Sequence, residues 1–324
     1  MRPDGGDSNF VVFKSGLEFP RFFPGPMEGV MTLLFCRVFH KLNLTRAWLT
    51  PYYRITTSIP KPAKLQKFLQ PYMEAGLPVI AQLMGTDAVL LAGAAGQMIN
   101  CGARGINLNF ACPSRQVLKS GAGGAMLRDI DLMTGILSEI KNTLPDTSIS
   151  VKIRCGFEDR RESEKIVPAL TSTGILDFIG VHFRTVEENY AAVPDGLERL
   201  RRITALAGTV PVIGSGDVFL CTDAQKILET GCAGAMIARG ILQNPFLIQN
   251  LQKPEKHRIT AEKGRQCFFK TLQETAKENP DFFKRSKFLE YATMMWGKSS
   301  PQFAEFITLS DREMLDFKFS QTIQ

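Results

Sequence analysis

Polar side chains stand at the ends of several short apolar runs in this chain, where a buried strand would give way to a loop. Lys152 and Arg154 end one run, and His182 ends the next. Burying such groups without partners costs roughly 2–7 kcal/mol, so a packed core has no use for them. We therefore expect them to line a shared site. The expected site residues are Pro26, Met27, Glu28, Gln82, Asn109, Cys112, Lys152, Arg154, His182, Arg184, Ser215, Gly216, Asp217, Ala238 and Arg239.

Cys112 is the candidate for a reactive thiol. It follows Asn109 by three residues and precedes the glycine-rich segment KSGAGGAM at residues 119–126. A buried packing residue is the common alternative for any cysteine. The position of Cys112 at a strand end, beside an amide side chain, favours a thiol that meets a substrate. The other cysteines lack such neighbours, and we interpret them as packing residues.

Two glycine-rich run ends, GSGD at residues 214–217 and ARG at residues 238–240, suit a phosphate group. Small residues allow backbone N–H groups to approach phosphate oxygens, although a plain tight turn explains either segment taken alone. Lys152 needs an anionic or carbonyl partner inside its strand, and a reduced flavin would supply one. His182 is placed to bond either a cofactor or a substrate.

Eight short apolar runs, each followed by a stretch with helical spacing, would position these side chains. The predicted strands are 21–27, 47–55, 78–85, 105–111, 148–155, 178–185, 210–217 and 233–240. The predicted helices lie near 32–42, 64–75, 88–101, 130–144, 163–173, 196–207 and 222–229, with a short one after Pro245. This alternation favours an α/β fold of the (β/α)8 TIM barrel type over an open doubly wound sheet. The site of such a barrel lies at the carboxyl ends of its strands.

The alternation stops near Pro254, and helical spacing continues to the end of the chain. We expect an N-terminal tail at residues 1–20, a barrel at 21–254 and a small all-helical domain at 255–324. Aromatic residues at helical spacing predict the core of the helical domain. They are Phe282, Phe283, Phe288, Tyr291 and Trp296.

The charge pattern is compatible with a polyanionic partner. The chain of 324 residues carries a formal net charge of +7, and its sequence pI is about 9.0. Residues 37–67 hold Arg37, Lys41, Arg46, Arg54, Lys61, Lys64 and Lys67 and no acidic residue. Such a stretch fits either a solvated face or contacts to nucleic acid phosphates.

Composition also indicates the compartment. The seven cysteines are scattered, without a CxxC pair or a Cys/His cluster, so we expect no metal site and a reducing, cytoplasmic setting. No apolar run approaches the ~20 residues that cross a bilayer, and the first 20 residues contain no signal-like segment, so we expect no membrane association.

With these residues in view, the chain resembles the tRNA-dihydrouridine synthases, a family of FMN-dependent reductases, and is most like their bacterial C-type branch. The resemblance covers residues 24–251 and continues weakly into the helical tail. Its most specific piece is NFACPSRQVLKSGAGGAML at residues 109–127. The other pieces are PMEGV (26–30), QLMG (82–85), VKIRCG (151–156), VHFRT (181–185), GSGD (214–217) and MIARGILQNP (236–245).

The resemblance implies a reaction and a role for each site residue. Asn109 and Arg154 would hold the target uracil of a tRNA, and we also expect Arg184 to contact the substrate. Hydride would pass from flavin N5 to C6 of the base, and Cys112 would protonate C5 as general acid; NADPH would first reduce the flavin. FMN would be held by Pro26, Met27, Glu28, Gln82, Lys152, His182, Ser215, Gly216, Asp217, Ala238 and Arg239.

The partner implied is tRNA, and we expect the protein to act as a monomer. The target nucleotide must leave its stack to reach a barrel mouth. Residues 37–67 and the cluster Lys284, Arg285 and Lys287 are the expected phosphate contacts.

Three positions depart from the family pattern: Ala111 and Phe183 replace glycine, and Ser215 replaces asparagine. Phe183 would either crowd the pocket mouth or point into a hydrophobic layer.

Two other functions remain open at the level of sequence. One is a flavin barrel that acts on a free small molecule, as dihydroorotate dehydrogenases and ene-reductases do. The other is a catalytically decayed RNA-binding protein, although the retained Cys112 and Lys152 argue against it. The sequence does not indicate which tRNA position is modified.

Overall fold

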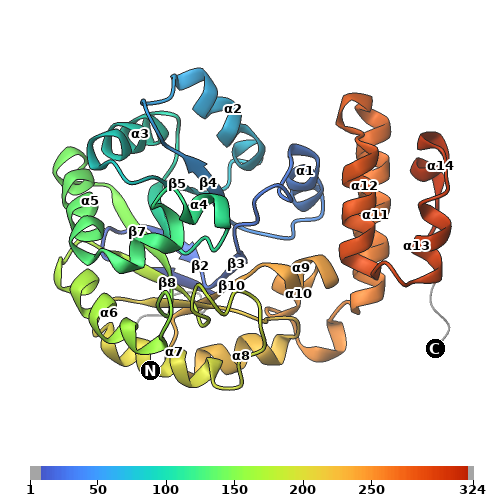
Figure 1. The fold of residues 1–324 in the computed structure, drawn as a ribbon. Coiled ribbons are helices and arrows are strands. Elements are labelled where there is room, and N and C mark those ends of the chain that lie inside the picture. The colour runs from blue at the N-terminus through green and yellow to red at the C-terminus, as the bar shows by residue number, and fades with distance from the viewer. Residues whose placement is uncertain (1–8, 320–324) are drawn as a thin grey trace.

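The alternating apolar runs of the sequence form eight parallel strands in the computed structural model, which describes residues 9–319. Hydrogen-bonded ladders join them in the order β3-β10-β9-β8-β7-β6-β5-β4, and β3 also lies against β4, so the sheet closes on itself. The predicted (β/α)8 TIM barrel is therefore confirmed (Figure 1). The strands are β3 (Phe22–Pro24), β4 (Trp48–Arg54), β5 (Val79–Met84), β6 (Gly105–Phe110), β7 (Ser148–Arg154), β8 (Phe178–His182), β9 (Val212–Ser215) and β10 (Gly234–Ile237).

Amphipathic helices follow the strands and surround the barrel, as Figure 1 shows. They are α1 (Leu33–Lys41), α2 (Pro62–Met73), α3 (Ala88–Asn100), α5 (Ile130–Thr143), α6 (Ser163–Ser172), α7 (Gly196–Leu206), α8 (Cys221–Glu229), α9 (Arg239–Gln243) and α10 (Leu247–Asn250). Aspartates cap two of them: Asp87 accepts from the backbone N–H of Leu90, and Asp129 from that of Leu132. Across residues 9–319, no helix has both the length and the apolar character that a bilayer span requires.

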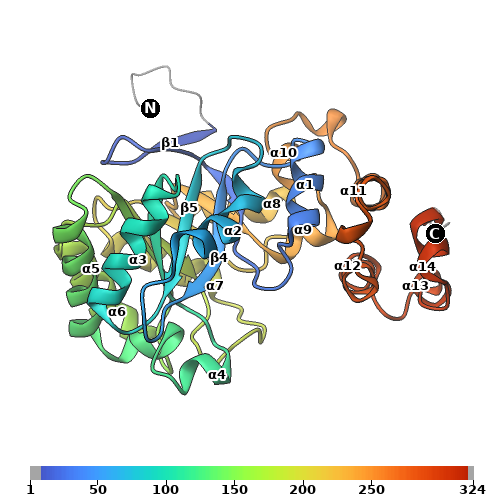
Figure 2. The same cartoon turned by 90° about the horizontal axis from the view of Figure 1, so that it is seen from above.

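An antiparallel hairpin of β1 (Phe10–Val12) and β2 (Glu18–Pro20) covers the amino end of the barrel. Phe13 and Phe19 of this hairpin are buried with Phe23 and Phe178 from the strands. Figure 2 shows the hairpin on one side of the barrel and α4 (Arg115–Leu118) on the other. The sequence prediction placed residues 1–20 in a tail, but the described part of that segment forms this hairpin. Residues 1–8 lie outside the described residues.

The C-terminal helices pack as a small bundle. They are α11 (Ala261–Glu278), α12 (Arg285–Trp296), α13 (Pro301–Phe306) and α14 (Asp311–Asp316). Phe269 lies at the centre of the bundle, with edge-on contacts to Phe288, Trp296 and Phe306. Among the five aromatic residues predicted as core, Phe288 and Tyr291 are fully buried, and the other three are half-buried.

The bundle is attached to the barrel along α1 and along the loop that follows β3. The Tyr291 hydroxyl of α12 lies 2.8 Å from the carbonyl oxygen of Val30, to which it donates, and 2.8 Å from Oγ1 of Thr32. Phe268 of α11 packs on Phe35, 5.4 Å between ring centroids. The helical region therefore holds the loop that carries the first residues of the expected site.

Tyr291→Phe should lower the free energy of unfolding by about 0.5–1.5 kcal/mol, because the Val30 carbonyl would lose its hydroxyl donor and keep only the N–H of Thr32. Urea denaturation followed by circular dichroism measures this. Tyr53→Phe is the matched control, since Tyr53 is half-buried with its ring against Phe68, and its change should stay within about 0.5 kcal/mol. Equal stabilities of the two variants would contradict the role of the Tyr291 hydroxyl.

Candidate active site

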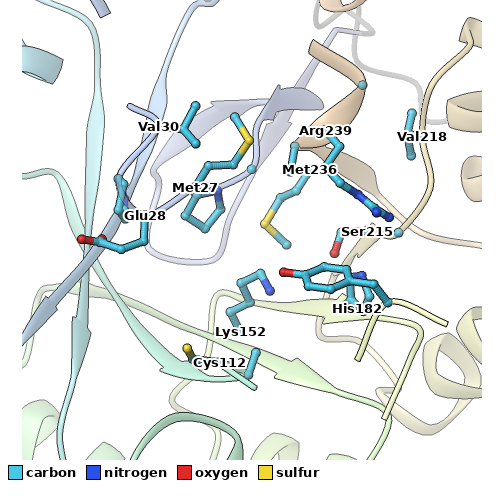
Figure 3. Close-up of a pocket in the computed structure, with 18 of the residues that line it drawn as sticks. Met27, Glu28, Val30, Cys112, Lys152, His182, Ser215, Val218, Met236 and Arg239 are labelled. Carbon is cyan, nitrogen blue, oxygen red and sulfur yellow. The ribbon is translucent and has the colours of Figure 1, made fainter. Parts of the chain in front are cut away.

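A cavity of about 380 Å³ opens at the carboxyl ends of the barrel strands. That volume lies within the range of small-molecule and cofactor sites. Figure 3 shows Lys152 between Cys112 and His182, with Met27 and Met236 across the cavity. Of the fifteen predicted site residues, fourteen line the cavity, and only Arg184 does not.

A chain of buried amide side chains crosses the barrel interior, and two of its members, Gln82 and Asn109, line the cavity. Nε2 of Gln82 donates to Oδ1 of Asn107 over 2.8 Å, and Nδ2 of Asn107 donates to Oγ of Ser150 over 2.9 Å. Nδ2 of Asn109 donates to Oε1 of Gln82 over 2.8 Å. Because each member both donates and accepts, the chain satisfies its own polar groups and holds each amide in one orientation.

Asn109 also fixes the conformation of the loop that carries Cys112. Its Oδ1 accepts hydrogen bonds from the backbone N–H groups of Ala111 at 3.0 Å and of Cys112 at 2.9 Å. The carbonyl of Cys112 in turn accepts from the N–H of Gly124 at 3.0 Å. The spacing of three residues between Asn109 and Cys112 therefore creates a side-chain-capped turn that aims the thiol at the cavity. Ala111 is buried here, and it does not block this turn.

The two strand-end arginines have different surroundings. Arg154 lines the cavity, is only 3% exposed, and donates from Nε to the carbonyl of Ala111 at 3.0 Å and from Nη1 to those of Thr185 and Asn189, each at 2.8 Å. It thereby ties the Cys112 loop to the loop after β8.

Arg184 lies beyond the end of β8 and outside the cavity lining. Its buried guanidinium donates to the carbonyl of Ala191 and pairs with the Asp217 carboxylate. The expected substrate contact therefore has no geometric support. The physical reason is that the strand ends at His182, so the alternation of side chains that would have aimed Arg184 inward no longer applies.

Lys152 and the neighbouring Arg154 make the cavity floor electropositive. The pKa of Lys152 is lowered to about 8, mainly by burial and also by the nearby Arg154, while Cys112 opposes the shift. Burial holds the pKa of His182 well below its ordinary value, assisted by Arg154 and Lys152. Nδ1 of His182 is buried, and no group in residues 9–319 bonds it. Such a buried, unpartnered atom beside a lysine fits a ligand with polar ring atoms.

The predicted phosphate corner has a backbone that only glycine accommodates. Gly216 has a φ of +126°, and a Cβ there would overlap the ring of Phe183. Phe183 is buried behind this loop and does not line the cavity. The substitution noted in the sequence therefore fills a hydrophobic layer and leaves the pocket mouth open. Arg239 is exposed beside the corner, where it pairs with Asp217 at 2.5 Å.

Several cavity residues were not predicted from the sequence. Tyr52 comes from β4, and Met294 comes from α12 of the helical bundle. Tyr190, in the loop after β8, is 57% exposed. The centroid of its ring lies 5.0 Å from the guanidinium carbon of Arg239 and 5.8 Å from that of Arg154. Tyr52 and Tyr190 could have been suggested by their position near strand ends. Met294 carries no local signal, because only tertiary packing brings α12 to the barrel mouth.

Residues 24–304 match the family model described as dihydrouridine synthase (Dus). The chain belongs to the dihydrouridine synthase family. Among curated proteins similar to this dihydrouridine synthase is the tRNA-dihydrouridine(16) synthase of Vibrio parahaemolyticus, 30% identical over 73% of this chain and 74% of the relative. The tRNA-dihydrouridine(16) synthase of Cupriavidus necator is 31% identical over 70% and 72%. The family predicted from the sequence motifs is therefore confirmed.

Solved structures share the barrel of this dihydrouridine synthase at low sequence identity. A variant of NCR from Zymomonas mobilis superposes with a TM-score of 0.55 at 16% identity, and it covers 78% of this chain and 92% of that one. Morphinone reductase in complex with tetrahydroNAD gives 0.54 at 11% identity, over 77% and 91%. These neighbours support the fold. As for metals, residues 9–319 contain no group of three or more His, Cys, Asp or Glu side chains arranged to hold an ion.

Lys152→Met should change how the stability of the flavin-free protein depends on pH. The pKa of Lys152 is about 8 in the folded protein, against an ordinary value of 10.5, so between these values the unfolded chain binds one more proton. Stability from Lys152 therefore rises with pH across this window, by about 3 kcal/mol, and this rise should be absent in Lys152→Met.

Urea denaturation at pH 7.5 and 10.5, plus Lys165→Met as an exposed-lysine control, measures the difference. If wild type and Lys152→Met showed the same pH dependence, the buried ammonium would be excluded.

Proposed function

We propose that this dihydrouridine synthase uses FMN and NADPH to reduce uridines in tRNA to 5,6-dihydrouridine. The observation that carries the proposal is one cavity that combines the Cys112 thiol with the buried bases Lys152 and His182, in a chain of this family. The relatives named above are tRNA-dihydrouridine(16) synthases. We therefore propose tRNA as the substrate and position 16 as the first site to map.

The residues of the cavity fit a flavin mononucleotide. His182 has a buried ring nitrogen without a partner, and Lys152 is a buried cation that would pair with a carbonyl edge. The loop at Gly216 and the Arg239 guanidinium would receive the phosphate. A bound flavin would supply the hydride for C6 of the uracil. The proposed cofactor residues are Pro26, Met27, Glu28, Gln82, Lys152, His182, Ser215, Gly216, Asp217, Ala238 and Arg239.

We propose that Asn109 and Arg154 orient the uracil. Both line the cavity beside Cys112, and uracil presents carbonyl oxygens and a ring N–H that amide and guanidinium groups bond. Arg154 also holds the backbone of the Cys112 loop, so substrate contact and thiol position are coupled. The Cys112 thiol would donate its proton to C5 of the base. Arg184 is proposed to act indirectly, by holding Asp217.

We propose that the tRNA lies across the carboxyl end of the barrel (residues 21–254) and the helical domain (255–324). Arg37 and Lys41 are committed to Glu74 and Glu278, each at 2.6 Å. Arg54 ends β4 on the cavity side, whereas the exposed Arg46 precedes that strand, at the opposite end of the barrel. The basic stretch 37–67 therefore divides into cations near the site and cations away from it.

In the basic cluster of the helical domain, Arg285 and Lys287 already bond other groups of the protein. Arg285 donates to the carbonyl of Leu309 at 2.7 Å, and Lys287 donates to that of Gly29 at 2.7 Å. Lys284 is exposed and stays available to RNA. We retain the proposals of a monomer and of a cytoplasmic location. The free state of all seven cysteines supports the latter.

The decisive experiment is anaerobic absorption spectroscopy of the purified protein. FMN-loaded protein should bleach on addition of NADPH and regain its colour on addition of unmodified tRNA, and sequencing of the product RNA maps the position reduced. A flavin that bleaches but ignores tRNA would favour a small-molecule reductase. Protein that binds no FMN would remove the enzymatic proposal.

Cys112→Ala should keep FMN and lose about 100-fold to 10,000-fold of turnover on unmodified tRNA, because it removes the proposed proton donor. Cys101→Ala is the control, since Cys101 follows α3 outside the cavity. Single-turnover mixing of reduced protein with tRNA measures the rate. Near-normal turnover of Cys112→Ala would exclude the thiol as proton donor.

Arg54→Ala should weaken tRNA binding and reduce the slope of log K against log salt by about 1, because one phosphate contact is lost. Arg46→Ala removes the same charge at the opposite end of the barrel and should leave both quantities unchanged. Filter binding at several salt concentrations measures them. Equal effects of the two substitutions would indicate only a general charge effect.

A further inference from the structure

Tyr52 enters the cavity because β4 contains a bulge. The pairing of β4 with β5 shifts between Leu49 and Tyr52, so that β4 uses one residue more than its neighbour. In a regular strand, consecutive side chains point to opposite faces, yet Pro51 and Tyr52 both line the cavity. Tyr53 then points outward, with its ring 5.1 Å from that of Phe68. Bulges of this kind often re-aim a side chain beside an active site.

The re-aimed Tyr52 side chain lines the same cavity as Cys112. Both side chains pack on a small apolar cluster of Met84, Val117 and Ala122. The pKa of Tyr52 is raised to about 12, and burial is the largest cause. The charge of Cys112 and a hydrogen bond between the two side chains also raise this pKa. The charge of Glu28 adds to the shift, and Arg54 opposes it.

The Cys112 thiol and the Glu28 carboxyl differ in their access to solvent. Cys112 is half-buried and also faces Lys152 and Arg154 electrostatically. Glu28 is exposed at the cavity rim, and partial burial raises the pKa of its carboxyl. Tyr52 therefore shares the cavity with an inner sulfur atom and an outer acid.

The proposed reaction requires that the Cys112 sulfur be protonated again after each turnover. Each turnover moves the Cys112 proton to C5 of the base and leaves a thiolate, which must be protonated before the next turnover. Lys152 is committed to the flavin in the proposed function, and a tRNA across the cavity would separate the thiolate from bulk water. A group bonded to the thiolate and connected to the rim meets this need.

We propose that Tyr52 returns the proton to Cys112 after each turnover and recovers its own from Glu28. This inference rests on the proposed function. The Tyr52 O–H bond breaks as the S–H bond forms, and the phenol oxygen takes a proton that the Glu28 carboxylate passes on from water. Glu28 ends as it began, the water has given up one proton, and no electron is transferred. The transfer is concerted because a free tyrosinate would be costly at this half-buried position.

The test compares Tyr52→Phe with Tyr53→Phe, which removes the same atom from the outward-facing neighbour. Enzyme reduced beforehand is mixed with unmodified tRNA, reduced again with dithionite, and mixed a second time. In Tyr52→Phe the first turnover should stay within about twofold of wild type, and the second should slow by at least about tenfold. A small acid such as imidazolium should restore the second turnover in proportion to its concentration. Tyr53→Phe should match wild type in both turnovers.

Glu28→Gln provides the second variant, at saturating FMN. It should also slow the second turnover more than the first. A normal second turnover in Tyr52→Phe, or an equal loss in both turnovers without rescue by acid, would overturn the proposal. A normal second turnover in Glu28→Gln would overturn the route through the rim.

A separate measurement distinguishes this proposal from the proposed function. Iodoacetamide should alkylate Cys112 at a different rate in Tyr52→Phe than in wild type, because the sulfur loses its hydroxyl neighbour. This readout requires no tRNA. Equal alkylation rates would overturn the contact itself, whereas wild-type protein that never reduces tRNA would remove the proposed function and, with it, the relay.

Discussion

The interior of the barrel has to satisfy every polar group that it buries, and the site depends on how it does so. The Gln82 amide links Asn107 to Asn109. The side-chain nitrogen of Asn109 bonds Gln82, and its side-chain oxygen accepts from the backbone N–H of Cys112. An apolar replacement at any link would leave its partner unpaired in a medium of low dielectric constant. The position of the thiol therefore follows from a hydrogen-bond chain that runs through the adjacent strand β5.

Electrostatics in the same cavity follow from burial. Lys152, Arg154 and His182 lie together at the carboxyl ends of β7 and β8, while Glu28 is exposed and Asp217 is ion-paired with Arg184 and Arg239. Arg154 lowers the pKa of both Lys152 and His182, so the positive potential of the cavity comes from Arg154 and Lys152, beside an uncharged His182. Such a cavity favours a ligand that brings carbonyl oxygens and phosphate, as a flavin mononucleotide does.

The helical domain shares in the site. The Tyr291 hydroxyl bonds the carbonyl of Val30, and Met294 lines the cavity. Contact of RNA with α12 would therefore act on the loop after β3 through a short path of packed and hydrogen-bonded groups. The proposed proton path through Tyr52 opens onto the same loop at Glu28. Substrate contact and proton return thus meet at one rim.

The sequence alone determined the barrel, the family and fourteen cavity residues, because parallel strands place all their carboxyl ends on one face, and a strand end is readable locally. Tertiary structure decided the rest. Arg184 bonds Asp217 instead of facing the cavity, Tyr52 faces it only because a bulge interrupts the alternation of β4, and Met294 reaches it from a helix far along the chain. Local spacing does not encode these contacts, since each depends on a partner that only the packed fold brings near.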